Sequence, residues 1–168
     1  GDPHIVPRLV MKARSGSLKR VGNGENLVDV THVKNAALAH VLALEALQGG
    51  KNIGGNSYFI GQERPVNLWN FIDDILIRAG VESVTGSVSY GAAYAAGLVF
   101  EKLFSLAGIS SPEPPITRFV ALQFAKSHYF SHERAKKDLG YEPEISIEEG
   151  LATLFEGKRE RRLAIDKV

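Results

Sequence analysis

Cysteine is absent from the 168 residues, and this absence excludes several kinds of chemistry at once. Without thiols the chain can form no disulfide, no thiolate nucleophile and no cysteine-based zinc site. The composition fits a reducing compartment, so we expect a cytoplasmic protein.

An excess of charge of either sign is also lacking. The chain has 20 Lys and Arg against 19 Asp and Glu, which gives a formal net charge of +1. Domains that bind nucleic acid usually present a clear basic excess to the phosphate backbone. We therefore expect no nucleic-acid partner.

The sequence has no initiating Met and no signal peptide, since it opens Gly1-Asp2-Pro3-His4. This opening is typical of a chain entered partway through a loop, so we expect a piece of a longer protein. Its length suits one domain with a core of its own, and we predict a single domain over residues 1–168.

Charge is missing altogether from Ser83 to Phe100, a stretch that approaches the length of a membrane span. The stretch contains Ser, Thr and Gly and is only moderately hydrophobic, which favours a buried or surface-docking helix over a span. Peripheral contact of residues 83–109 with a membrane stays open at this point.

Apolar periodicity and capping residues predict a helix-rich chain with a few short strands. A glycine turn at Gly22-Asn23-Gly24 predicts that two of the strands form a hairpin. The run of apolar residues at Ser57–Ile60 predicts a strand buried on both faces. The expected helices are 5–15, 31–47, 68–79, 90–107, 117–124, 132–139 and 148–162, and the expected hairpin strands are 18–21 and 27–30.

Several motifs, taken in order, resemble the extended short-chain dehydrogenases, and most closely their 3-beta-hydroxysteroid dehydrogenase branch. The first motif is the run from Gly22 to His40, with its glycine turn, Asn, Asp and Val-x-Asn helix start. The further motifs are Gly55-Asn56-Ser57-Tyr58-Phe59-Ile60, Pro65-Val66-Asn67-Leu68-Trp69, Thr117-Arg118 and Arg134-Ala135-Lys136-Lys137-Asp138-Leu139-Gly140-Tyr141-Glu142-Pro143. Arg134 stands where the family often has Lys.

The resemblance implies an α/β fold class, here the helix-rich C-terminal lobe of such an enzyme without most of its Rossmann sheet. It implies a parent that uses NAD or NADP to oxidise or reduce a small apolar secondary alcohol or ketone. Unpaired edges of a strand at Ser57–Ile60 and the apolar helix at 90–107 favour a homo-oligomer. We expect this chain alone to bind no cofactor and to be inactive. It lacks the glycine fingerprint for the dinucleotide, and none of its five tyrosines has Lys four residues later.

Three residues are candidates for substrate binding. The resemblance places His4 in a turn that follows a central strand of the family's nucleotide-binding sheet. Tyr94 lies on the apolar helix, where aromatic residues could line a sterol-sized pocket or form an ordinary core stripe. Epimerase-type relatives pair an arginine of the equivalent lobe with an anionic substrate group, which suggests Arg118, although a surface ion pair fits this residue as well. We assign no catalytic residue.

Other polar residues have simpler interpretations. Asp29, His32 and Asn35 fit a strand-to-helix turn with local capping. His128 and His132 have the spacing of metal ligands on a helix, but no carboxylate base lies between them, so we predict no metal site.

Two other functions remain open. A nucleotide-sugar epimerase or dehydratase fragment would share the ending motif, and Lys19 and Arg20 could serve a diphosphate. A non-catalytic interaction module is the third alternative.

Overall fold

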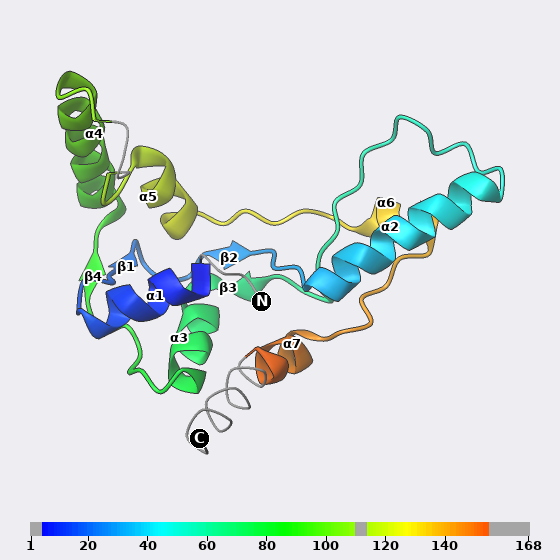
Figure 1. Ribbon diagram of the computed structural model, residues 1–168, viewed down its shortest axis with the longest axis horizontal. Coiled ribbons are helices and arrows are strands. Elements are labelled where there is room, and N and C mark those ends of the chain that lie inside the picture. The colour runs from blue at the N-terminus through cyan, green and yellow to red at the C-terminus, as the bar shows by residue number, and fades with distance from the viewer. Residues whose placement is uncertain (1–4, 110–113, 155–168) are drawn as a thin grey trace, which may run out of the picture. The chain divides into compact units, whose positions relative to one another are not determined.

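The computed structural model describes residues 5–109 and 114–154, which form helices joined by loops and very short strands (Figure 1). The helices are α1 (Ile5–Arg14), α2 (Val33–Gln48), α3 (Leu68–Arg78), α4 (Tyr90–Leu106), α5 (Arg118–Ala125), α6 (Glu133–Leu139) and α7 (Ile147–Thr153). The strands are β1 (Arg20–Val21), β2 (Leu27–Val28), β3 (Val66–Asn67) and β4 (Ser87–Val88). The helix-rich fold class is therefore confirmed, and each expected helix has a counterpart.

Contacts group the described residues into two compact units, each assembled from separate stretches of the chain. Unit 1 takes in Asp29–Val66 and the described residues from Tyr129 on. Unit 2 takes in the described residues up to Val28 and within Asn67–His128. The expectation of a single domain stays a prediction.

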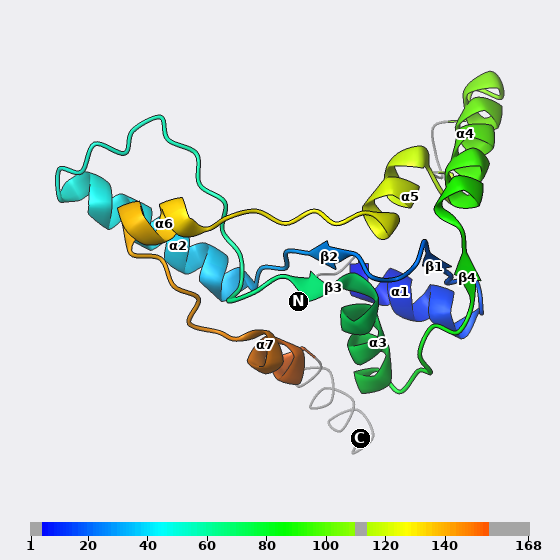
Figure 2. The same ribbon diagram turned by 180° about the vertical axis from the view of Figure 1, so that it is seen from behind.

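The core of unit 2 forms around α3, which lies beside α1 in both views (Figures 1 and 2). Trp69 is its largest fully buried side chain, and its indole nitrogen donates to the carbonyl of Phe124 at 3.2 Å. Asn67 caps α3 by accepting from the backbone N–H groups of Trp69 and Asn70, as the sequence predicted. The buried core residues are Leu9, Val21, Trp69, Ile72, Leu76, Val84, Ala93 and Ala121.

The expected hairpin is wrong. β1 pairs in parallel with β4, with Arg20 opposite Ser87 and Val21 opposite Val88, and not with β2. Gly24, at φ +79°, is instead held by Asn67, whose side-chain N–H donates to the Gly24 carbonyl at 2.8 Å. The glycine turn therefore does not decide which strands pair. β1 pairs with the distant β4 because this pairing buries Val21 in the core beside α3.

In unit 1, α6 packs beside α2 (Figure 2). Their shared core consists of Ala39, Ala46, Ile53, Ala135, Leu139 and Tyr141, with Leu42, Ala43, Tyr58 and Ile60 against it. The alanines allow the two helices to approach closely. Gly140 ends α6 at φ +71°, a left-handed conformation that glycine adopts without strain.

The predicted buried strand at Ser57–Ile60 is also wrong. The segment pairs with none of the strands that the structure describes, and the Phe59 side chain is 55% exposed. Phe59 stacks on Phe130 with ring centroids 4.0 Å apart, while Tyr58 and Ile60 face the core of unit 1. Side chains of an extended segment alternate between two faces, so an unbroken apolar run did not require both faces to be covered.

Local capping is largely as predicted. Ser146 and Glu149 form the expected capping box at the start of α7. His32, and not Thr31, caps α2, since its Nδ1 accepts from the backbone N–H of Lys34 at 3.3 Å. The Thr31 hydroxyl instead donates to the carbonyl of Ile60.

Asn35 is more than a helix-start residue, because its fully buried amide ties α2 to two distant segments. Its Nδ2 donates to Gln62 Oε1 and to the Ile145 carbonyl, both at 2.7 Å. Its Oδ1 accepts from the backbone N–H groups of Glu144 and Ile145. Every hydrogen-bonding group of this amide is satisfied, as the burial of a polar group requires.

Candidate functional site

The predicted substrate-binding residues Tyr94 and Arg118 come together in unit 2, where α4 lies beside α5 (Figure 1). Tyr94 is on the first half of α4, and Arg118 is the first residue of α5, capped by the Thr117 side chain. The third candidate, His4, lies outside the described residues. We call Tyr94, Glu101 and Arg118 the α4–α5 cluster.

Glu101 is the member of the α4–α5 cluster that the sequence did not reveal. Its Oε2 accepts from Arg118 Nε, and its Oε1 accepts from the Arg118 backbone N–H, both at 2.7 Å. The backbone and side-chain hydrogen bonds from Arg118 hold the pKa of the Glu101 carboxyl below its ordinary value. The same carboxylate, together with the Tyr94 hydroxyl, raises the pKa of the Arg118 guanidinium. Arg118 is thus fixed by a surface ion pair, one of the two roles that its sequence position allows.

Gly97 allows α4 and the start of α5 to lie in close contact. A Cβ at this position would meet the Arg118 nitrogen and the Thr117 carbonyl carbon at 2.6 Å, well inside van der Waals contact. Gly97 is accordingly buried, as is Ala93 one turn earlier. The α4–α5 cluster therefore depends on a glycine that lets the start of α5 rest directly on α4.

A guanidinium has several N–H donors, of which the Glu101 carboxylate uses one at Nε. The guanidinium also lies beside the Tyr94 hydroxyl, and the Arg118 side chain is 46% exposed. Such an arrangement can donate hydrogen bonds to an anionic oxygen of a ligand on the α4 surface. Phe100 and Phe104 are only half-buried and pack along the same helix.

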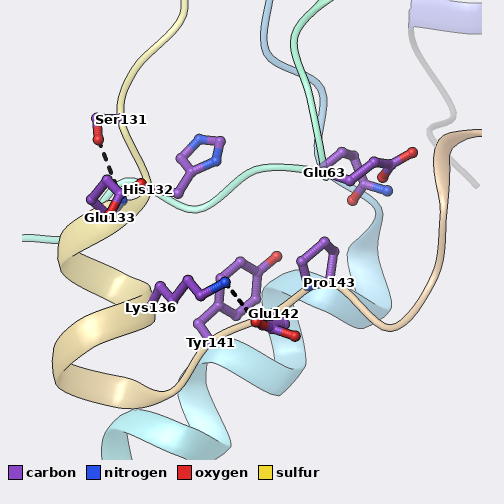
Figure 3. Close-up of a pocket in the computed structure, with 9 residues that line it drawn as sticks. Glu63, Ser131, His132, Glu133, Lys136, Tyr141, Glu142 and Pro143 are labelled. Carbon is purple, nitrogen blue, oxygen red and sulfur yellow. Dashed lines mark hydrogen bonds and ion pairs between the residues drawn. The ribbon is translucent and has the colours of Figure 1, made fainter.

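Unit 1 contains a second polar site, a pocket of about 520 Å³ at the start of α6 (Figure 3). It is lined by Gln62, Glu63, Ser131, His132, Glu133, Lys136, Tyr141, Glu142 and Pro143. Lys136 and Glu142 form an ion pair of 2.8 Å across it, which raises the pKa of Lys136 and lowers that of Glu142. Burial raises the pKa of the Tyr141 hydroxyl, which donates to the Gly61 carbonyl at 2.7 Å.

His132 and Asp29 meet beside this pocket. His132 Nε2 lies 3.4 Å from Asp29 Oδ2, which also accepts from the Phe130 backbone N–H at 2.8 Å. Asp29 therefore secures the segment that leads into α6, and does not merely fix the local turn that the sequence suggested. His132 fits closely against Gly61, which has no Cβ to obstruct the ring.

The described residues contain no cluster of three or more His, Asp or Glu side chains that could hold a metal ion. None of the helices in this described part of the chain combines the length and the apolar character needed to cross a bilayer.

Comparison with known proteins finds a family that matches about half of this chain. Residues 1–88 match the 3-beta hydroxysteroid dehydrogenase/isomerase family. The chain is 44% identical over 154 residues to a 2-alkyl-3-oxoalkanoate reductase of Stenotrophomonas maltophilia, an alignment that covers 92% of this chain and 46% of the relative. It is 34% identical to the mouse decarboxylating sterol-4-alpha-carboxylate 3-dehydrogenase, covering 89% of this chain and 42% of that one.

The fold also has a counterpart among solved structures. UDP-glucuronic acid 4-epimerase from Bacillus cereus, in complex with NAD, aligns with a TM-score of 0.54 at 18% identity. That alignment covers 87% of this chain and 36% of the epimerase, and at this identity it establishes a shared fold alone. The chain spans less than half the length of the curated relatives it matches.

Proposed function

The chain belongs to the 3-beta hydroxysteroid dehydrogenase/isomerase family, and we propose on that basis that it forms the substrate-binding portion of an NAD(P)-dependent oxidoreductase. The reaction interconverts a secondary alcohol and its ketone. Reduction adds a hydride to the carbonyl carbon and a proton to its oxygen, and oxidation removes both.

The names of the two relatives support a narrower substrate class. A 2-alkyl-3-oxoalkanoate and a sterol 4-carboxylate that is oxidised at position 3 have one feature in common. In both, the carbon that carries the reacting oxygen is next to the carbon that bears a carboxylate, within a large apolar body. We propose such a β-hydroxy or β-oxo acid as the substrate.

The α4–α5 cluster is the observation that carries this assignment. It places the guanidinium of Arg118, from α5, beside the phenol of Tyr94 on α4, a helix whose other residues are mostly apolar. A carboxylate can pair with the Arg118 N–H groups that Glu101 does not use, while the apolar body lies along α4. The apolar surface of α4 suits a sterol or a long alkyl chain better than a polyhydroxylated sugar.

The residues of this chain do not fit the dinucleotide itself. Gly22 and Gly24 lead from β1 toward β2 and not into the N-terminus of a helix, which is where a pyrophosphate binds. The Tyr-x-x-x-Lys pair is absent as well. We therefore assign the cofactor and the proton-transferring groups to the portion that the relatives have beyond this alignment, and derive no step for them here.

Of the two residues that suggested a sugar nucleotide, Arg20 has a partner within unit 2. Arg20 forms an ion pair of 3.2 Å with Asp73, which in turn accepts from the Val84 backbone N–H. The Lys19 side chain lies against Gly86. The Arg20 guanidinium is thus engaged within unit 2, and Lys19, which is exposed, is a single cation where a diphosphate would need more.

A chimera tests the proposal. This chain would replace the matching portion of the Stenotrophomonas reductase, and the rate of ketone reduction would be measured with a 2-alkyl-3-oxoalkanoate. In Arg118→Ala we expect the KM for the acid to rise about 10-fold or more, the cost of losing a hydrogen bond to a charged group. The KM for the dinucleotide should not change.

Two controls separate substrate binding from scaffolding. Arg78→Ala removes another exposed arginine of unit 2 and should leave the KM unchanged. A neutral ketone of similar size, without the carboxylate, should be reduced equally well by the parent chimera and by Arg118→Ala. If Arg118→Ala lowers the reduction rate of the acid and of the neutral ketone equally, then Arg118 has a structural role and does not bind the carboxylate.

A further inference from the structure

The turn between β1 and β2 contains a pair of residues that occurs once in the chain, an asparagine followed by glycine (Figure 1). Asn23 is one of seven asparagines. The other six are followed by Leu27, Ala36, Ile53, Ser57, Leu68 and Phe71. Glycine has no Cβ, so nothing hinders the approach of its backbone nitrogen to the preceding side chain. Asn23 is exposed, and water therefore reaches this pair.

The amide of Asn23 is folded back across Gly24. Its Oδ1 accepts from the Glu25 backbone N–H at 3.1 Å, and its Nδ2 donates to Glu25 Oε2 at 2.7 Å. Both ends of the amide are thus bound to the residue that follows Gly24, and the side chain does not extend into water. The hydrogen bond to Oδ1 also polarises the carbonyl, which makes its carbon Cγ a better electrophile.

The backbone nitrogen of Gly24 is available for reaction. Its N–H forms no hydrogen bond with any residue that the structure describes. The Gly24 carbonyl, in contrast, accepts from Asn67 Nδ2 at 2.8 Å, and the residue has a φ of +79°. A free nitrogen and a polarised carbonyl carbon therefore lie on adjacent residues of an exposed turn.

We propose that Asn23 is a modification site, at which the chain deamidates without an enzyme. The Gly24 nitrogen loses its proton to water and forms a bond to Asn23 Cγ. The bond from Cγ to Nδ2 then breaks, and this nitrogen takes up a proton and leaves as ammonia. Water opens the resulting cyclic succinimide at either carbonyl, which gives aspartate or isoaspartate. The net reaction consumes water and releases ammonia, and it does not depend on the proposed enzymatic function.

Both products place a new carboxylate beside Glu25. The hydrogen bond of 2.7 Å from Asn23 Nδ2 to Glu25 Oε2 is replaced by an unfavourable contact between like charges. Isoaspartate also adds a methylene to the main chain immediately before Gly24, whose carbonyl holds Asn67 at the start of α3. Because α3 carries the fully buried Trp69, the modification should loosen the core of unit 2.

The test follows the folded, unaltered chain during incubation in mildly alkaline buffer. Peptide mapping by mass spectrometry, with chromatography that separates isoaspartate from aspartate, measures conversion at every asparagine. We expect Asn23 to convert roughly tenfold or more faster than Asn56, which is exposed but is followed by serine, because a side chain on the next residue hinders cyclisation. Conversion at Asn23 should be as fast in the folded chain as in urea, since the fold leaves both reacting groups accessible.

Asn23→Gln is the decisive variant, because glutamine would have to close a larger ring. After the same incubation, urea unfolding of the unaltered chain should show a second population with a lower midpoint, in proportion to its isoaspartate content. Asn23→Gln should keep its original midpoint. The matched control is Asn56→Gln, which should lose stability on incubation as the unaltered chain does. Freshly made Asn23→Asp supplies the aspartate product alone and should lose less stability than the isoaspartate form.

Three results would overturn the proposal. One is conversion at Asn23 that is no faster than at Asn56. Another is conversion that occurs only in urea, which would show that the fold protects the pair. The third is an equal loss of stability when Asn23→Gln is incubated, which would assign the loss to another part of the chain.

Discussion

The carboxylate of Glu101 accepts two hydrogen bonds from a single residue, one from the Arg118 backbone N–H and one from its guanidinium Nε, both at 2.7 Å. One acid on α4 thereby satisfies an N–H of the first turn of α5 and fixes the direction of the arginine side chain. This relationship joins α4 to α5 and fixes the arginine that we propose as the carboxylate ligand's partner.

Glu101→Gln should lower the stability of the chain at neutral pH, and the difference should shrink in acid. The folded-state pKa of Glu101 is depressed, so its contribution is fully present above the unfolded-state pKa of about 4.3. The contribution is lost as the pH falls through the lower, folded-state value. The measurement is urea unfolding of both proteins from pH 7 to pH 3. A difference in unfolding free energy that stays constant over this range would contradict the assignment.

Gly97→Ala should destabilise unit 2 by about 1–3 kcal/mol, the usual cost of an added group in a tightly packed site. The new Cβ would collide with the backbone at Thr117 and Arg118, which cannot move without opening the contact with α5. Gly91→Ala is the matched control, because nothing lies within 4 Å of a Cβ at that position of the same helix. It should be neutral or stabilising by up to roughly 1 kcal/mol, since alanine favours helix. Thermal unfolding of both variants would decide, and equal effects would refute the steric explanation.

Asn35→Ala should be among the most damaging single changes in unit 1. It would leave the Glu144 and Ile145 N–H groups without the Oδ1 acceptor and remove a donor from Gln62 and from the Ile145 carbonyl. Each buried group left unsatisfied costs about 1–3 kcal/mol. Asn70→Ala, at an exposed position of α3, should change stability by no more than a few tenths of a kcal/mol, as surface changes usually do. Similar losses in the two variants would show that the Asn35 network contributes little.

The chain by itself should show no measurable affinity for NADH or NADPH. It has neither the glycine turn that holds a pyrophosphate nor the Tyr-x-x-x-Lys pair. Titration followed by nucleotide fluorescence would test this, with the Stenotrophomonas reductase as the positive control. A dissociation constant in the micromolar range would mean that the chain has a dinucleotide site of another kind.

The sequence by itself determined what depends on neighbours along the chain. The helices were predictable because apolar periodicity and capping are local along the chain. The caps Asn67 and Ser146 and the helix end at Gly140 each depend on residues within one turn. The family was recognisable because its motifs keep their order along the chain.

Tertiary structure alone decided which distant residues meet. β1 pairs with β4 and not with β2, which follows it in the sequence. Phe59 lies in an apolar run, yet its ring is exposed and stacks on Phe130. The Glu101–Arg118 pair and the role of Gly97 could not be predicted either. Both depend on how closely α5 approaches α4, which is set by packing between helices and not by the local preference of either one.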